Sequence, residues 1–139
     1  MTKSETSLDY RFDTRVARDY DLMRGHPPEV SAQIGRTIAS YFDPGARVLE
    51  IGVGTGRIAL PVAAEGCEVF GVDLSSEMLS GLAHRLENDS NQTIHLAQGD
   101  IRALPYREGV FDGAMAIHVL HLVSDWSEVL EQVSRLLRP

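Results

Sequence analysis

Three glycines stand close together behind an apolar segment that ends in glutamate and isoleucine, in the stretch VLEIGVGTGRIAL of residues 48–60. Gly52, Gly54 and Gly56 lack a Cβ atom, so the chain can turn tightly with positive φ and let a ligand touch the backbone. A helix that begins directly afterwards would aim its free N–H groups at whatever occupies the loop. A tight strand-to-helix turn without a ligand explains the same pattern, so a second feature must decide.

That second feature is Asp73, which ends the next apolar segment 21 residues after Gly52. A carboxylate there can accept hydrogen bonds from both hydroxyls of a ribose, each worth roughly 1.5–3 kcal/mol. Capping of the helix that begins near Ser75 is the alternative role, and one side chain can do both. Together the loop and the acid predict a site for an adenosine-containing cofactor.

The residues around the loop favour a cationic cofactor. A dinucleotide fingerprint reads G-x-G-x-x-G, but here Arg57 takes the place of the last glycine. Glu50 stands two residues before Gly52, where its carboxylate would repel a pyrophosphate and attract a cation. S-adenosylmethionine carries a sulfonium and an ammonium group and no phosphate. The sequence therefore favours S-adenosylmethionine, with NAD as the weaker alternative.

The elements that must position these residues alternate along the chain. Strands are predicted over residues 46–51, 67–73, 93–100 and 111–120, and helices over 13–24, 28–42, 55–66, 75–88 and 125–139. This alternation predicts a doubly wound, Rossmann-like α/β fold with a parallel sheet and helices on both faces. Ligands of such sheets bind beyond the carboxyl ends of the strands, at the switch point next to the first strand.

Single residues indicate where the predicted helices begin. Ser75 is predicted to cap the helix over 75–88, and Asp125 with Glu128 has the spacing of a capping box. Pro61 must lie in the first turns of the helix over 55–66, or it would kink that helix. Residues 1–44 are expected to form a tail and lid helices, and residues 45–139 the cofactor-binding domain.

Composition narrows the class of protein. The chain has 139 residues, 43% of them hydrophobic, and a formal net charge of -7, which fits one globular domain. Because no cluster of Lys and Arg stands out, a nucleic-acid partner is not expected. No apolar run approaches the roughly 20 residues of a membrane span, and the polar start lacks a signal peptide, so a cytoplasmic protein is expected. Cys67 is the single cysteine, and the histidines follow no ligand spacing, so no metal site is expected.

Three stretches in order resemble the four motifs of the class I S-adenosylmethionine-dependent methyltransferases. VLEIGVGTGRIAL is similar to the first motif, GVDLSSEML to the second, and QGDIRALPYREGVFDGAMAIHVLHLV to the third and fourth. The resemblance covers roughly residues 45–139 and is nearest in pattern to small-molecule methyltransferases of the ubiquinone and menaquinone type. It implies a methyltransferase that passes a methyl group from S-adenosylmethionine to a small-molecule acceptor.

The resemblance also implies roles for single residues. The residues implied to face the methionine part of the cofactor are Glu50 and the backbone of Gly52, Val53, Gly54 and Gly56. Those implied around the ribose and adenine are Asp73 at the ribose, Leu74 and Met78 near the adenine, Asp100 at the adenine amino group and Ile101 against the ring. The backbone around Ile117 and His118 would close the site, and Tyr20 and Arg24 are candidates for the lid, with packing or surface exposure as their alternative.

His118 and His121 are the candidate catalytic residues, because they are expected at the carboxyl end of the fourth strand. A general base there would accelerate transfer to a hydroxyl or an acidic carbon by roughly 10²–10⁴-fold. A histidine that caps a helix or lies in a loop is the alternative for both.

In the family the last helix is followed by a fifth strand and a hairpin. The chain is therefore expected to be a fragment of a longer enzyme, a chain that pairs the open edge of its fourth strand with a second copy, or a short module. Two function classes follow from this: a methyltransferase, or its cofactor-binding portion, and a non-catalytic module or partner subunit that binds S-adenosylmethionine or S-adenosylhomocysteine.

Overall fold

The computed structural model describes residues 26–88 and 92–139, which form one parallel sheet and its covering helices. The strands are β1 (Arg47–Ile51), β2 (Glu68–Asp73), β3 (Ile94–Gln98) and β4 (Gly113–Ala116). Their order across the sheet is β3-β2-β1-β4, and every neighbouring pair is parallel. The order reverses beside β1, so the switch point lies between β1 and β4, where the sequence predicted it.

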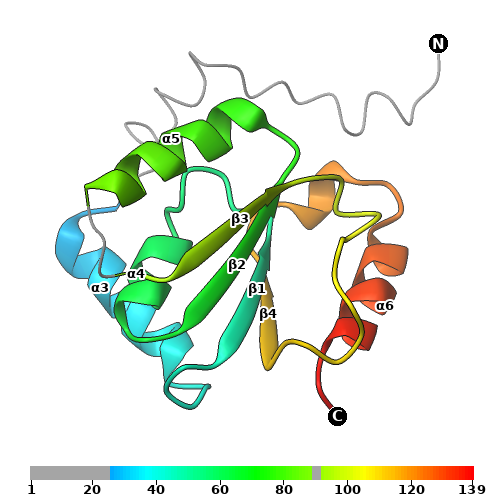
Figure 1. The fold of residues 1–139 in the computed structure, drawn as a ribbon, viewed down its shortest axis with the longest axis horizontal. Helices are drawn as coiled ribbons and strands as arrows, with labels where there is room; N and C mark the ends of the chain where they lie inside the picture. Colours follow the sequence, from blue (N-terminus) through cyan, green and yellow to red (C-terminus); the bar gives the residue numbers. More distant parts are fainter. Residues whose placement is uncertain (1–25, 89–91) are drawn as a thin grey trace.

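Helices cover both faces of the sheet (Figure 1). Those described are α3 (Pro28–Ala39), α4 (Ala59–Ala64), α5 (Ser76–Glu87) and α6 (Trp126–Leu136), with a short 3-10 helix at Leu120–Leu122. The first three lie on one side of the sheet and α6 lies on the other. This arrangement confirms the predicted doubly wound, Rossmann-like fold.

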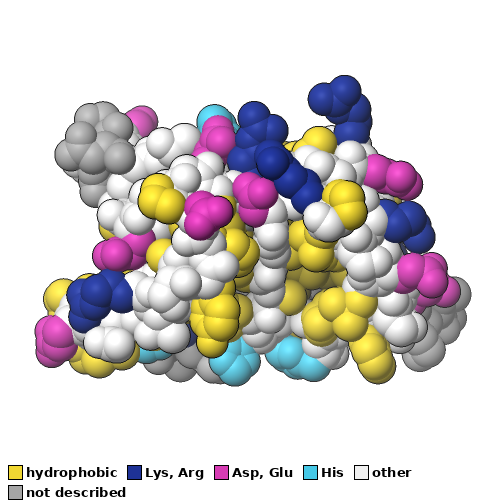
Figure 2. All heavy atoms as spheres, turned by 90° about the horizontal axis from the view of Figure 1, so that it is seen from below, with side chains coloured by type: hydrophobic (Ala, Val, Ile, Leu, Met, Phe, Trp, Pro, Cys, Tyr) yellow, Lys and Arg dark blue, Asp and Glu magenta, His cyan; other side chains and the backbone are white. Residues whose placement is uncertain are grey.

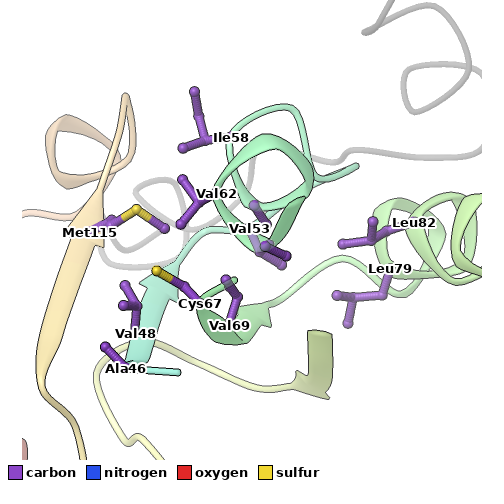
Figure 3. Packing of buried hydrophobic residues seen from close by; sticks show 12 residues of the cluster. Ala46, Val48, Val53, Ile58, Val62, Cys67, Val69, Leu79, Leu82 and Met115 are labelled. Atoms are coloured by element: carbon purple, nitrogen blue, oxygen red, sulfur yellow. The ribbon is translucent and has the colours of Figure 1, made fainter. Parts of the chain in front are cut away.

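Alternate residues of β1 face opposite cores, which is why Val48, Leu49 and Ile51 are all apolar. Val48 packs with residues of α4 and α5, and Figure 3 shows this cluster gathered around Val62 and Val69. Leu49 and Ile51 pack on the other face with residues of α6. All three β1 side chains are buried. A strand that is covered on both faces gains burial from every residue rather than every second one.

Two glycines, Gly35 and Gly113, lack a side chain where α3 and the residue Phe42 that follows it pack closely. A Cβ atom at Gly35 would collide with the carbonyl oxygen of Pro61, so α3 and α4 cross with their backbones nearly touching. A Cβ atom at Gly113 would collide with the ring of Phe42, which lies against the start of β4. The segment directly before β1 is thereby fixed against the sheet.

The elements are generally shorter than the sequence predicts, and two of them differ most, α4 and β4. The helix expected over 55–66 is limited to α4, because the preceding residues form the glycine loop; Pro61 lies in its first turn, as predicted. The strand expected over 111–120 ends at Ala116. Phe111 instead forms an isolated parallel bridge with Leu137, which follows the end of α6.

One predicted helix cap is confirmed and the other is wrong. The Ser75 hydroxyl accepts a hydrogen bond from the Met78 amide at 3.1 Å, so Ser75 caps α5. Asp125 precedes α6 without a side-chain capping bond, because its backbone is not in the extended conformation that turns the carboxylate back over the helix. The Glu128 amide donates to the Asp125 backbone carbonyl at 3.1 Å instead.

Acidic and basic side chains are intermixed on the surface that Figure 2 shows, with hydrophobic side chains gathered in its hollowed middle. Among residues 26–88 and 92–139, no helix has both the length and the apolar character that crossing a membrane requires.

Candidate functional site

The glycine loop adopts the conformation that its sequence predicts. The φ angles are +74° at Gly52, +59° at Gly54 and +88° at Gly56, a region that residues with a Cβ atom seldom adopt. The chain therefore leaves β1 in a tight loop over the carboxyl ends of β1 and β2, and the three glycines are required by its backbone geometry.

Most of the loop amides are already used inside the protein. The amides of Gly52 and Val53 both donate to the Val72 carbonyl, at 2.8 and 3.0 Å. The Gly54 amide donates to the Asp73 carboxylate at 2.8 Å, and the Gly56 amide donates to the Val53 carbonyl at 3.1 Å. These four donors do not point outward, so they do not form the cradle that a pyrophosphate needs. The predicted free N–H groups belong to the helix that follows the loop, so these four bonds do not test that prediction.

Asp73 connects the loop to the helix that follows β2. One carboxylate oxygen accepts from the Gly54 amide, and the other accepts from the Ser75 amide at 2.9 Å. Burial raises the pKa of Asp73, and backbone hydrogen bonds from Ser75, Gly54 and Leu74 oppose that rise. Since a carboxylate oxygen has lone pairs for more than one bond, Asp73 can hold the loop and still accept from a hydroxyl.

Glu50 is a buried acid that lacks a full set of partners. It is 2% exposed, and its Oε1 atom has no hydrogen-bond partner among the described residues. Burial raises the pKa of Glu50 well above its ordinary value, the charge of Arg57 lowers it, and the charge of Asp73 raises it further. An ionised carboxylate in this position is costly unless a donor or a cation reaches it. Burial therefore favours the protonated form of Glu50, and a cation or donor that reached its carboxylate would stabilise the ionised form.

Two of the predicted contact residues form the floor beneath the loop. Val53 is 4% exposed and covers Gly71, where a Cβ atom would lie 2.7 Å from a Val53 methyl. Met78 is 3% exposed, and its Cε atom lies 3.2 Å from the position of a Cβ atom at Gly54. Their side chains support the loop from within, whereas Leu74 is 47% exposed beside Asp73.

The end of β3 brings Asp100 toward Asp73. The amide of Gly99 donates to the Asp73 carbonyl at 2.9 Å. The carboxylate of Asp100 accepts from the Arg102 guanidinium at 2.8 and 3.1 Å and from the Arg102 amide at 2.9 Å. The Arg102 hydrogen bond lowers the pKa of Asp100 and keeps it ionised. An adenine amino group would share this carboxylate with Arg102.

Ile101 and the segment after β4 differ in burial. Ile101 is buried in the core beneath α6. His118 and His121 are both exposed, and His118 has a positive φ of 57°. Their neighbour Val119 contacts the glycine loop, because a Cβ atom at Gly52 would lie 2.6 Å from its methyl group. The structure therefore brings the segment that contains His118 to the loop, although β4 itself ends earlier.

Three polar contacts near the site were missed from the sequence. Arg57 Nη1 lies 3.3 Å from His26 Nε2, Arg102 pairs with Asp100, and Gln132 on α6 binds the backbone after Asp100. Only the contact of Arg102 could have been predicted from the sequence, because its charge is opposite to that of Asp100 two residues before it. The lid candidates Tyr20 and Arg24 lie outside the described residues. Within the described ranges no three His, Cys, Asp or Glu side chains form a group that could hold a metal.

Known methyltransferases are similar to this chain in sequence. A phosphatidylethanolamine N-methyltransferase of Cereibacter sphaeroides is 34% identical over 120 residues, which are 86% of this chain and 58% of that protein. A demethylmenaquinone methyltransferase of Tropheryma whipplei is 35% identical over 95 residues, 68% of this chain and 38% of that protein. The chain spans about half the length of the curated relatives it matches.

A solved structure shows the same fold. Phosphoethanolamine N-methyltransferase 2 of Haemonchus contortus, in complex with phosphomonomethylethanolamine and S-adenosylhomocysteine, superposes with a TM-score of 0.80 at 23% identity. The match covers 100% of this chain and 34% of that one. Residues 49–139 match the family described as "Methyltransferase domain". The chain belongs to this methyltransferase domain family, as the order of its motifs predicted.

Proposed function

We propose that this chain is the cofactor-binding portion of an S-adenosylmethionine-dependent methyltransferase with a small-molecule acceptor. The observation that carries the proposal is Glu50, a buried acid with one oxygen that lacks a hydrogen-bond partner among the described residues. It lies next to a loop in which the amides of Gly52, Val53, Gly54 and Gly56 already bond within the protein. A cofactor with an ammonium and a sulfonium group would stabilise the ionised form of this acid, whereas a pyrophosphate adds negative charge beside Glu50.

The residues at the ends of β1 and β2 would hold the methionine and ribose portions. Glu50 would face the ammonium group across the backbone of Gly52 to Gly56. Asp73 would accept from the ribose hydroxyls with the lone pairs that its bonds to Gly54 and Ser75 leave over. Exposed Leu74 is suited to lie against the adenine, while Met78 supports the loop from below.

The residues after β3 and β4 would complete the site. Asp100 would accept from the adenine amino group after giving up part of its pairing with Arg102, which is a partly exposed ion pair and therefore weak. Ile101 would lie behind the ring, and the backbone at Ile117 and His118 would close the cofactor against Gly52. Tyr20 and Arg24 stay predictions for the lid.

Methyl transfer requires positioning more than reactive side chains. The cofactor supplies a methyl group on a positively charged sulfur, and the protein must align an acceptor in line with it. His118 and His121 lie in the segment after β4 whose Val119 contacts Gly52, and they stay the candidate bases for the proton that an acceptor hydroxyl loses. The relatives act, by their names, on phosphatidylethanolamine and demethylmenaquinone, which supports a small-molecule acceptor. A cytoplasmic location and a second copy paired along the edge of β4 stay predictions.

A non-catalytic module that binds S-adenosylmethionine or S-adenosylhomocysteine is the second candidate. The exposure of both histidines favours it, because general-base chemistry is more efficient in a site closed from water. Methyl transfer from S-adenosylmethionine to a small amine, phenol or quinol would decide for the enzyme. Binding without transfer to any of these acceptors would decide for the module.

Calorimetric titration tests the cofactor assignment. Purified chain is titrated with S-adenosylhomocysteine and, in parallel, with NAD. We expect binding of the first with a dissociation constant on the order of micromolar and none of the second. NAD binding of equal strength would overturn the assignment, and so would a folded protein that binds neither ligand.

A further inference from the structure

One side chain of α6 holds the backbone that follows β3. The Gln132 amide nitrogen donates to the Ile101 carbonyl at 3.1 Å, and its amide oxygen accepts from the Leu104 amide at 2.7 Å. Both bonds are partly buried and join residues about thirty positions apart in the chain. A single glutamine thus bridges the two ends of a four-residue turn.

That turn also determines where Asp100 points. The Ala103 amide donates to the Asp100 carbonyl at 2.9 Å, and the Arg102 amide donates to the Asp100 carboxylate. Ile101 packs into the core that includes Val129 and Val133 of α6. Rotation of the turn would therefore move the Asp100 carboxylate, and the Gln132 bridge is the polar contact that opposes such rotation from outside the turn.

A fixed carboxylate can distinguish between two purine bases. An ionised carboxylate only accepts hydrogen bonds, so it favours the amino group of adenine and disfavours the carbonyl that hypoxanthine has at the same position. This discrimination depends on geometry, because a hydrogen bond weakens steeply when the donor and acceptor are misaligned. Whatever fixes the turn therefore also determines the preference for the base.

We propose that Gln132 is a positioning residue that sets Asp100 to select adenine over hypoxanthine in the cofactor. The proposal rests on the proposed function, since it takes S-adenosylhomocysteine as the ligand. It extends the site to α6, which would act on the cofactor indirectly, through the turn that Gln132 holds at Ile101 and Leu104.

The test compares S-adenosylhomocysteine with its inosine analogue, S-inosylhomocysteine, by calorimetry. The proteins are the unsubstituted chain, Gln132→Met, which keeps the side-chain length without hydrogen bonds, and Gln33→Met, a matched control on the exposed side of α3. Gln132→Glu is added in case Gln132→Met does not fold, because it keeps an acceptor for the Leu104 amide and loses the donor to Ile101. Urea unfolding of each variant measures any change in stability separately.

We expect the unsubstituted chain and Gln33→Met to prefer S-adenosylhomocysteine by about tenfold to a hundredfold, the worth of one charged hydrogen bond. In Gln132→Met the preference should fall below about threefold, mainly through weaker binding of S-adenosylhomocysteine. The preference of Gln132→Glu should lie between those of the unsubstituted chain and Gln132→Met. A merely structural glutamine would lower the unfolding midpoint and leave the preference unchanged, which would overturn the inference. Tight binding of both ligands by the unsubstituted chain would also overturn it, while leaving the proposed function intact. Binding of neither ligand would overturn both.

Discussion

The two halves of the candidate site are built differently. At the ends of β1 and β2, Asp73 holds the Gly54 and Ser75 amides, and Val72 holds Gly52 and Val53, so this half is bonded to itself. After β3 and β4, the chain is held from outside by Gln132 and by the contact of Val119 with Gly52. The first half is held mainly by hydrogen bonds among its own residues, whereas the second depends on the elements that pack against it.

We infer from this difference that the two halves bind different parts of the ligands. A rigid half suits the portion of the cofactor that is the same in every reaction, its ribose and amino-acid end. A half that is held through long-range contacts suits the adenine edge and the acceptor, where related proteins of one fold must differ. The contrast can be tested by substitutions that should damage one half and spare the other.

The largest effect on the rigid half is expected from Gly56→Ala. The new Cβ atom would lie 2.5 Å from the buried Leu82 methyl in a backbone conformation that alanine disfavours. We expect a loss of about 2–4 kcal/mol in the free energy of unfolding, measured by urea denaturation. Gly45→Ala is the matched control: φ is +80° there but no atom lies within 4 Å, so only about 1 kcal/mol should be lost. Equal losses would show that the loop is not tightly packed.

Asp73→Ala should be next in size and should act on the ligand. It removes the acceptor for Gly54 and Ser75 and the predicted partner of the ribose, so S-adenosylhomocysteine should bind tenfold to a few hundredfold more weakly by calorimetry. Asp112→Ala is the control, because Asp112 also accepts from a backbone amide, that of Arg47 at 2.8 Å, at the opposite end of β1. That variant should lose stability and keep its affinity. An unchanged affinity in Asp73→Ala would show that the ribose does not bind at Asp73.

Glu50→Gln should change the pH dependence of stability. Because burial raises the pKa of Glu50 above its ordinary 4.5, the folded protein keeps a proton that the unfolded chain releases. The stability of the unsubstituted chain should therefore fall as the pH rises from about 4.5 through the folded-state pKa, and the variant should lack this component. We expect the variant to be more stable at pH 7 by on the order of 1 kcal/mol and to bind S-adenosylhomocysteine more weakly. Parallel curves of unfolding free energy against pH would contradict the assignment of Glu50 as the buried acid.

Arg102→Ala should have the smallest effect, in the adaptable half. Its ion pair with Asp100 is about one third exposed on each side, so its loss should change stability by less than about 1 kcal/mol. The pKa of Asp100, which the Arg102 hydrogen bond lowers, should return toward its ordinary value. An NMR titration of the Asp100 carboxyl measures this directly. A stability loss as large as that of Gly56→Ala would mean that this half is as rigid as the first.

What the sequence could predict follows the same division. The glycine loop, Asp73 and the Ser75 cap depend on residues near one another in sequence or on paired strands, and their types imply their geometry. The length of β4 and the bridge of Phe111 with Leu137 depend on packing between distant segments, which periodicity does not encode. The capping box failed because the spacing of Asp125 and Glu128 says nothing of the backbone angle at Asp125. Gln132 has no local signal, since a half-buried glutamine on a helix looks the same whatever it binds.

The most direct test of the cofactor's place is an NMR titration of ¹⁵N-labelled protein with S-adenosylhomocysteine. Five amide signals, those of Gly52, Val53, Gly54, Gly56 and Leu74, report on the rigid half. Our prediction is that these five signals shift most, with smaller shifts at Ile101 and His118. Binding accompanied by shifts that gather elsewhere, at α3 or at the opposite end of the sheet, would contradict it.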